Sequence, residues 1–147
     1  MQVIGRISRA SLTFDRAIAT SLNRFDLHPS EFDVLATLLR NGAPHELQVS
    51  DLVKRTMVTA AAVSQRLNKL EGRGLVNRRI DSENRRAVIV TLTAEGYELI
   101  SRALTAHVET EHTLLNTLTV TERNQLACLL RKLLLSLGDS PFSGNPG

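Results

Sequence analysis

The sequence predicts a mainly helical fold with one small β-hairpin, an α+β class, and three observations support this prediction. Over most of the 147 residues, apolar side chains recur at spacings of three, four and seven, which is the period of a helix. Between residues 75 and 92 the pattern changes to β-branched residues on either side of a polar loop. Apolar residues make up 42% of the chain, which is enough for the core of one domain.

The first two helices are expected over residues 3–25 and from Pro29 onward. Pro29 suits a first helical position, where its missing N–H is not needed, and Glu31 lies near the positive end of the helix dipole. Asn41 and Gly42 are typical of a helix end. The apolar seam of the first helix consists of Val3, Ile4, Ile7, Phe14, Ile18, Leu22 and Phe25.

Two further helices precede the hairpin. The first is short, from about residue 49 to residue 55, and residues 56–59 separate it from the second. The second helix turns Val63, Leu67 and Leu70 toward the core and ends at Gly72 and Gly74. The hairpin then spans residues 75–92, with the basic loop DSENRR between its strands.

Two helices are expected after the hairpin. Thr93 caps a long helix, and Thr119 with Glu122 forms a capping box that opens the last one. Residues 126–137 of that last helix are apolar on nearly every side. One domain of this size has little interior left for such a helix, so we expect burial against a second copy of the chain. The turn-forming tail, residues 138–147, is expected to be disordered.

The positive charge of the chain is concentrated in its middle. The net charge is +3, but residues 54–86 carry nine basic side chains against three acidic ones, which leaves a net of −3 elsewhere. Such a block is typical of a surface that meets phosphates, although a solvated, salt-bridged face is the alternative. Aromatic residues make up only 3% and Trp is absent, which disfavours proteins that bind single strands by stacking bases on aromatic rings. Binding to duplex DNA remains possible.

A winged helix-turn-helix consists of two helices joined by a tight turn and followed by a basic hairpin, which is the order of elements predicted here. Residues 27–100, above all LNKLEGRGLVNR, DSENRRAVIV and LTAEG, closely resemble the MarR family of bacterial transcription regulators. The resemblance implies a single domain over residues 1–147, with a DNA-binding part at 29–92 and dimerisation helices at 1–27 and 93–137. It also implies a ligand-responsive repressor that acts as a homodimer on an inverted-repeat double-stranded DNA operator. The charged N-terminal residues, unlike a signal peptide, and the single cysteine indicate a cytoplasmic location.

The outward face of the helix before the hairpin is the expected reader of DNA. Gln65 can make two hydrogen bonds to adenine, Ser64 can bond to either kind of base, and exposed methyl groups can meet thymine. Plain helix propensity is the alternative explanation for the alanines. Arg66, Lys69 and Arg73 suit backbone phosphates or neighbouring elements better than bases. The full candidate set on this helix is Thr59, Ala60, Ala61, Ser64, Gln65, Arg66, Asn68, Lys69 and Arg73.

The hairpin loop is the second expected DNA contact. Arg85 and Arg86 lie at its tip, where members of the resembled family commonly insert one arginine into the minor groove. The resemblance pairs the other arginine with the acid at the position of Asp81. This chain has Asn84 where the family usually has Asp, so one acid that would orient the arginines is missing.

A small aromatic or phenolic effector is implied by the resemblance alone, in a pocket between the dimer helices and the winged part. The segment LLNTLTVTERNQLACLLRKLL resembles the subgroup that includes urate-responsive regulators. Those members rely partly on a tryptophan in the first helix, and this chain has none, which disfavours urate. A winged helix used for protein contact is the alternative function, but it would need an exposed apolar face in place of the basic cluster.

Other function classes lack the residues that they require. The catalytic and nucleotide-binding motifs are absent, so we expect no enzyme, no cofactor and no metal site. His107 and His112 are five residues apart on one helix, roughly 140° away from sharing a face. Cys128, the single cysteine, lies among leucines and is expected to be an inert buried thiol. The chain also lacks the run of about 20 apolar residues that a membrane span requires.

Overall fold

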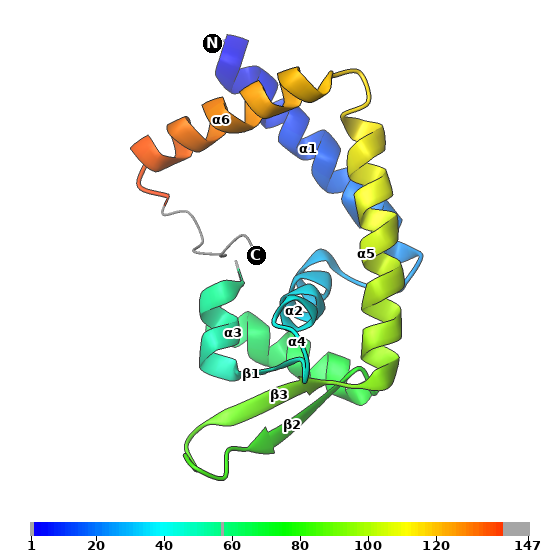
Figure 1. Cartoon of the computed structure of the whole chain (residues 1–147), viewed down its shortest axis with the longest axis vertical. Helices are drawn as coiled ribbons and strands as arrows, with labels where there is room; N and C mark the ends of the chain where they lie inside the picture. Colours follow the sequence, from blue (N-terminus) through cyan, green and yellow to red (C-terminus); the bar gives the residue numbers. More distant parts are fainter. Residues whose placement is uncertain (1, 57, 140–147) are drawn as a thin grey trace. The chain divides into compact units, whose positions relative to one another are not determined.

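The computed structural model describes residues 2–56 and 58–139, which fall into two compact units. The first unit is Met1–Thr110 and contains four helices, a small sheet and most of a fifth helix. The second unit is Glu111–Gly147 and contains the end of that fifth helix and the last one. Each unit is therefore described by itself (Figure 1).

The helices confirm those that the sequence predicts, and two of them begin at caps beyond those that the sequence predicts. Thr59 Oγ1 accepts a hydrogen bond from the Ala62 amide at 3.3 Å, which caps the helix before the hairpin. His28 takes the same role ahead of Pro29, because its Nδ1 accepts from the Ser30 amide at 3.1 Å. The helices are α1 (Gln2–Asn23), α2 (Pro29–Arg40), α3 (Val49–Arg55), α4 (Ala60–Gly72), α5 (Ala94–Leu114) and α6 (Val120–Ser136).

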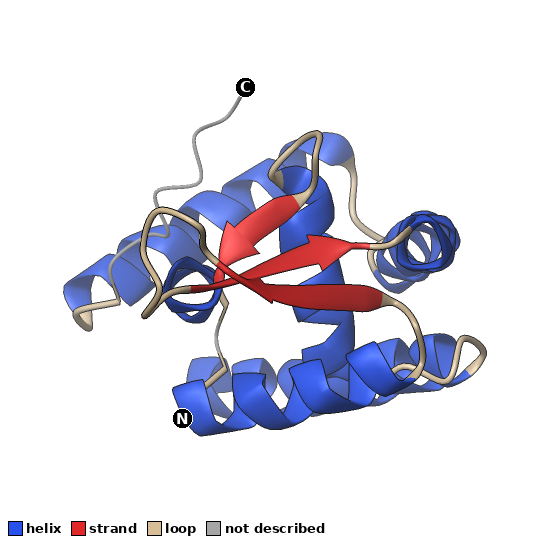
Figure 2. Cartoon of the chain, turned by 90° about the horizontal axis from the view of Figure 1, so that it is seen from below, coloured by secondary structure: helices blue, strands red, loops and turns tan. Residues whose placement is uncertain are grey.

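The sheet of the first unit contains the predicted hairpin and one additional strand. The hairpin consists of β2 (Val76–Ile80) and β3 (Val88–Leu92), and β1 (Glu46–Gln48) pairs with the other edge of β3, so the antiparallel order is β1-β3-β2. Figure 2 shows the three strands side by side. Three residues are too few to show strand alternation, so β1 is recognisable only by its pairing with β3.

The turn from α4 into β2 fixes where the hairpin begins. Gly74 has a φ of 72°, a left-handed conformation that favours glycine. The Leu75 amide donates to the Leu70 carbonyl oxygen at 3.0 Å and the Gly74 amide donates to the Glu71 carbonyl oxygen at 2.9 Å. These two bonds form a Schellman motif, which ends α4 and directs the chain at once into the sheet.

One hydrophobic core holds α4 against the rest of the first unit. The predicted inward residues Val63, Leu67 and Leu70 are all buried, and they pack with residues of α2, α3, the sheet and α5. The largest fully buried apolar side chains of this core are Leu22, Leu27, Leu35, Leu38, Leu52, Leu67, Leu70 and Ile100. Because its inward face is fixed in this way, α4 presents a defined outward face.

Each unit leaves apolar side chains uncovered. In the first unit, Val3 and Ile4 of α1 are each 66% exposed. In the second unit, α6 contains no buried residue and its apolar face is open to solvent. Cys128 is therefore exposed, and the expectation of a buried thiol was wrong for the single chain: leucines adjacent in sequence lie on different sides of a helix and do not enclose it.

The expected disordered tail lies outside the described residues from residue 140 onward. Gly138 and Asp139 are described and end α6, because the Asp139 amide donates to the Leu134 carbonyl oxygen at 3.0 Å. Among the helices of residues 2–56 and 58–139, none has the length and hydropathy needed to cross a membrane.

Candidate nucleic-acid interface

The outward face of α4 is a continuous stripe of small and amide side chains. Ala61, Ser64, Gln65 and Asn68 follow one another at spacings of three, four and seven residues, so they share one face, and all four are exposed. Thr59 and Ala60, at the start of the helix, are exposed as well. The stripe lies opposite the buried residues of α4 and is free to contact a ligand.

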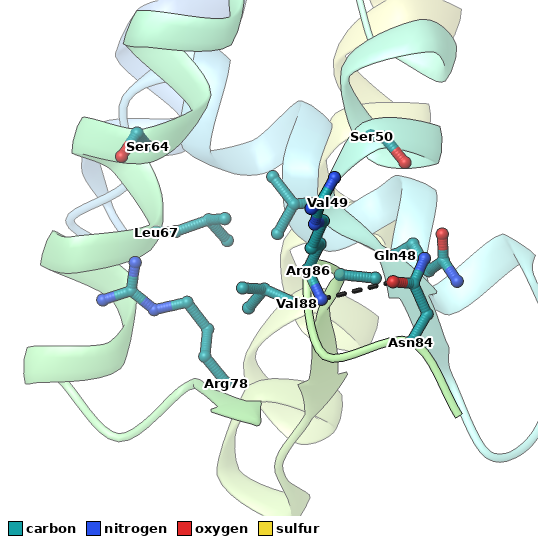
Figure 3. A pocket seen from close by; sticks show the side chains of 10 residues that line it. Gln48, Val49, Ser50, Ser64, Leu67, Arg78, Asn84, Arg86 and Val88 are labelled. Atoms are coloured by element: carbon teal, nitrogen blue, oxygen red, sulfur yellow. Dashed lines mark hydrogen bonds between the residues drawn. The ribbon is translucent and has the colours of Figure 1, made fainter. Parts of the chain in front are cut away.

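A hollow of about 440 Å³ separates this stripe from the wing, which we define as residues 76–92. Figure 3 shows the side chains that line it: Ser64 and Leu67 from α4, Ser50 from the start of α3, and Arg86 and Asn84 from the loop of the wing. Polar and cationic side chains thus surround the hollow on several sides. Its floor is apolar and includes Val49, Leu67, Ala87 and Val88.

Asn84 orders the tip of the wing through the backbone. Its Oδ1 accepts a hydrogen bond from the Arg86 amide at 3.2 Å, and its carbonyl oxygen accepts from the Ala87 amide at 2.9 Å. This is a side-chain-stabilised turn of the kind that Asn and Asp both form. The tip therefore keeps a defined turn although the chain has Asn84 in place of an acid, and the side chains of Arg85 and Arg86 are exposed.

The expected pairing between Asp81 and a tip arginine was wrong for this structure. Asp81 Oδ2 accepts a hydrogen bond from Gln48 Nε2 at 3.3 Å, and Oδ1 accepts from the Glu83 amide at 3.0 Å. Within the described part of the chain, no ion pair joins Asp81 to Arg85 or Arg86. The carboxylate is engaged by β1, which the sequence did not reveal, so Asp81 anchors the start of the tip loop to β1 and does not orient the arginines.

A buried carboxylate lies behind α4, and sequence reasoning missed its role. The side chain of Glu31 is 0% exposed, with Lys69 Nζ 3.4 Å from its Oε1 and Arg73 Nη1 3.6 Å from its Oε2. A buried charge needs such partners, because its transfer out of water is costly. The available signal was an acid on the apolar face of a helix, beside Val34 and Leu35, together with two cations four residues apart on another helix.

Arg73 serves the neighbouring elements, which was one of the two roles that the sequence left open. Its guanidinium also donates to the carbonyl oxygens of Asp26 at 2.6 Å and of Phe25 at 3.3 Å. It therefore fastens the end of α4 to the segment between α1 and α2. Lys69 keeps a more exposed side chain, at 59%, and remains available on the outer face.

Ion pairs divide the nine basic residues of segment 54–86 into two groups. Lys69 and Arg73 pair with Glu31, Arg78 pairs with Glu71, and Arg79 Nη2 lies 3.4 Å from Glu46 Oε2. The charge of these four is thus partly balanced within the protein. Within residues 2–56 and 58–139, the other five form no ion pair: Lys54, Arg55, Arg66, Arg85 and Arg86.

His107 and His112, which the sequence places on different faces of one helix, fall in different units. His107 belongs to the first, is half-buried, and its ring centroid lies 4.8 Å from that of Phe32. His112 is exposed in the second unit. No group of three His, Cys, Asp or Glu side chains in the described ranges is arranged to hold a metal ion.

Comparisons with known sequences all point to one family. A sequence model of the MarR family matches residues 25–87. The HTH-type transcriptional regulator PecS of Dickeya dadantii is 38% identical over 133 residues, which cover 90% of this chain and 80% of that protein. The transcriptional repressor MprA of Escherichia coli K12 is 31% identical over 100 residues, which cover 68% of this chain and 57% of that protein.

Solved structures of DNA-binding regulators have the same fold as this chain. A mutant of MarR from E. coli, in complex with operator DNA, superposes with a TM-score of 0.80 at 24% identity and covers 91% of this chain and 94% of that one. BpsR of Bordetella bronchiseptica, described in connection with regulation of its DNA binding by 6-hydroxynicotinic acid, gives a TM-score of 0.79 at 27% identity. That alignment covers 90% of this chain and 93% of BpsR.

Proposed function

This chain belongs to the MarR family of transcriptional regulators, and we propose that it is a ligand-responsive repressor that binds an inverted-repeat DNA operator as a homodimer. One observation carries the proposal most directly. The exposed stripe of α4 lies beside a wing whose two tip arginines form no ion pair among the described residues. A helix of this kind fits the major groove, and an arginine on a projecting loop reaches the minor groove or the phosphates.

The proposal assigns different tasks to different parts of α4. Ser64, Gln65 and Asn68 read base edges through hydrogen bonds, and the methyl groups near the start of the helix meet thymine. Arg66 and Lys69 contact backbone phosphates, which position the protein without reading sequence. Arg73 contributes indirectly, because it fastens the end of α4 to the backbone of the segment before α2.

A homodimer on an inverted repeat follows from symmetry. Two recognition helices related by a two-fold axis match two half-sites about one turn of DNA apart. The uncovered apolar residues of α1 and α6 support the dimer, because isolated soluble domains rarely leave apolar rows of this kind in water.

Salt dependence and single substitutions test the DNA contact. If three or four of the unpaired basic residues of each subunit meet phosphates, a dimer neutralises roughly 6 to 8 charges, and the log-log salt slope is about −5 to −7. We expect Gln65→Ala to cost about 1–3 kcal/mol at one operator position. Gln2→Ala, which removes an exposed glutamine from α1, is the control. Binding that ignores salt and sequence would contradict the proposal and favour a protein-contact role.

The wing is tested by the bases that flank the half-site. Arg85→Ala should weaken binding most where the flank is rich in A·T, since a narrow minor groove concentrates negative potential. Arg79→Ala is the matched control, because it removes the same charge from a side chain that is paired with Glu46. Equal losses on A·T-rich and G·C-rich flanks would mean that Arg85 contacts phosphates only.

We propose a small aromatic acid or phenol as the effector, supported by the regulation of BpsR by 6-hydroxynicotinic acid. Such a ligand changes operator affinity only through its different affinities for two protein states, a coupling of about 1–3 kcal/mol. A panel of aromatic acids and phenols is assayed for thermal stabilisation and for release of the operator. If no compound affects either property, the repressor does not respond to this class of ligand.

A further inference from the structure

Asn68 differs from the other reading residues because another protein side chain holds its amide. Its Oδ1 accepts a hydrogen bond from Arg78 Nη2, with 2.7 Å between the two atoms. Arg78 lies on β2, and Figure 3 shows its guanidinium reaching from the wing toward α4. The side chain of Asn68 is nevertheless exposed on the stripe that faces DNA in the proposed function.

The chemistry of the two groups determines which way this amide points. A guanidinium has only donors, so the atom of Asn68 that faces it must be the oxygen. A reversed amide would place its NH₂ group against the N–H of Arg78, donor against donor. The amide is thus held in one orientation, with one of the two acceptor sites of Oδ1 used by the protein and the Nδ2 hydrogens left for a ligand.

Glu71 keeps the guanidinium in place. Its carboxylate accepts a hydrogen bond from Arg78 Nε, and it lies three residues after Asn68 on the same helix. One guanidinium therefore bridges two neighbouring side chains of α4. The side chain of Arg78 is only 29% exposed, which limits exchange of these bonds with water.

We propose that Arg78 fixes the orientation of the Asn68 amide and thereby sharpens the base preference at one operator position, which an unrestrained asparagine would not do. A free asparagine recognises adenine with two bonds, accepting from N6 and donating to N7. An amide oxygen has two acceptor sites and Arg78 takes one of them, so Asn68 offers DNA one remaining acceptor site and its Nδ2 hydrogens in one fixed orientation. Gln65 forms no side-chain hydrogen bond in the described part of the chain, so its amide can turn to suit the base.

This inference rests on the proposed DNA binding, but it makes a separate claim. If Arg78 only fastened the wing to α4, its loss would weaken all operators alike. If it orients Asn68, its loss weakens the base preference at one position. Base preference is therefore the informative measurement, with overall affinity and folding measured in parallel.

The experiment selects binding sites from a randomised DNA library with the full-length protein at fixed salt. Asn68→Ala identifies the operator position that Asn68 faces. At that position we expect the wild type to favour one base over the others about fivefold or more, and Arg78→Leu to reduce this preference by a similar factor. Asn68→Asp keeps an acceptor for Arg78 and loses the donor, so it should move the preference toward cytosine, whose N4 donates.

Arg79→Leu is the matched control. It removes one arginine from the same strand and the same positive charge, but Arg79 contacts Glu46 and not α4. It should change affinity and leave the base preference as in the wild type. Circular dichroism and thermal unfolding establish that each variant is folded, and Asn68→Asp provides the test if Arg78→Leu does not fold.

The outcomes separate this inference from the function on which it rests. A wild type that selects no sequence from the library would overturn the proposed function and the role of Asn68 with it. A wild type that selects an operator while Asn68→Asp prefers the same base as the wild type would overturn the role of Asn68 alone. If folded Arg78→Leu keeps the wild-type base preference at that position, the role of Arg78 is overturned.

Discussion

At the scale of single residues, Glu31 is a buried carboxylate that depends on two cations at the inner side of α4. Its carboxylate lies in the core, where a charge without partners is strongly destabilising, and both of its partners come from α4. The partners themselves are partly exposed and can be hydrated without it. The dependence is therefore one-sided: Glu31 needs Lys69 and Arg73 more than they need Glu31.

This one-sided dependence predicts that removing the charge of Glu31 restores stability to a variant that lacks its partners. The double variant Lys69→Met, Arg73→Met should lower the free energy of unfolding by roughly 3 kcal/mol, because it leaves a buried carboxylate unpaired. Adding Glu31→Gln should recover a large part of this loss, since it removes the orphaned charge. Urea unfolding at one fixed chain concentration measures all three proteins. A triple variant as unstable as the double variant would contradict the argument.

The sequence predicts the exposed residues of α4 well and their polar partners poorly. Helical period alone separates Val63, Leu67 and Leu70 from the outward stripe, because burial follows spacing. The contacts from Lys69 to Glu31 and from Gln48 to Asp81 join residues 38 and 33 positions apart in the chain. No local pattern reports such pairs, which exist only after the elements have packed.

At the scale of elements, the start of α5 lies unusually close to the hairpin. A Cβ at Gly96 would collide with the Leu75 carbonyl oxygen and would come within 2.9 Å of Leu92 Cδ1. We expect Gly96→Ala to destabilise the protein by about 1–3 kcal/mol, because overpacking outweighs the gain in helix propensity. Gly5→Ala, in an open part of α1, should instead stabilise by about 0.5–1 kcal/mol. Thermal unfolding of both variants checks the difference in sign.

The capping box of α6 predicts a dependence on pH. The pKa of the Glu122 carboxyl lies below its ordinary value of 4.5. The main cause is the hydrogen bond that it accepts from the Thr119 backbone amide, and the second cause is the bond from the Thr119 hydroxyl. A lowered pKa means that the cap stabilises the folded state above about pH 4.5 and that this contribution is lost as the pH falls further. Thr119→Ala should bring the titration midpoint, followed by carbon NMR, part of the way back. An unchanged midpoint would exclude the Thr119 hydroxyl as a cause of the lowered pKa.

Helices and caps could be predicted from the sequence because their signals are local. Pro29 and the pair of Thr119 and Glu122 each mark a helix start within four residues. The strand β1 could not be predicted, since its three residues form a strand only through their pairing with β3. The turn that Asn84 makes at the wing tip depends likewise on the geometry of the hairpin around it.

At the scale of the whole molecule, the uncovered apolar side chains predict an obligate dimer. Leu130→Lys with Leu134→Lys should abolish dimers and folding together, since obligate dimers rarely have a stable monomer. Asn124→Lys with Gln125→Lys adds the same charge to exposed polar positions of α6 and should leave the dimer intact. Sedimentation measures the association state, and a well-folded monomer of the wild type at micromolar concentration would contradict the prediction.

The family could be inferred from residues 27–100, because the motifs there combine local structure with a distinctive order. The effector could not be inferred in the same way. The pocket proposed for it would be formed by side chains from several helices and from a second subunit, and no spacing in one chain encodes such an arrangement.

The pairing of β1 with β3 affects how the segment from β1 to β3 folds and unfolds. It joins Glu46 to Thr91, 45 residues apart, so α3, α4 and β2 lie inside one closed loop. Closing such a loop is entropically costly and is repaid only when the enclosed elements pack, which favours a single cooperative folding unit. Operator binding should therefore slow amide hydrogen exchange in β1, a strand that the proposed complex leaves untouched, by the same factor as in β3.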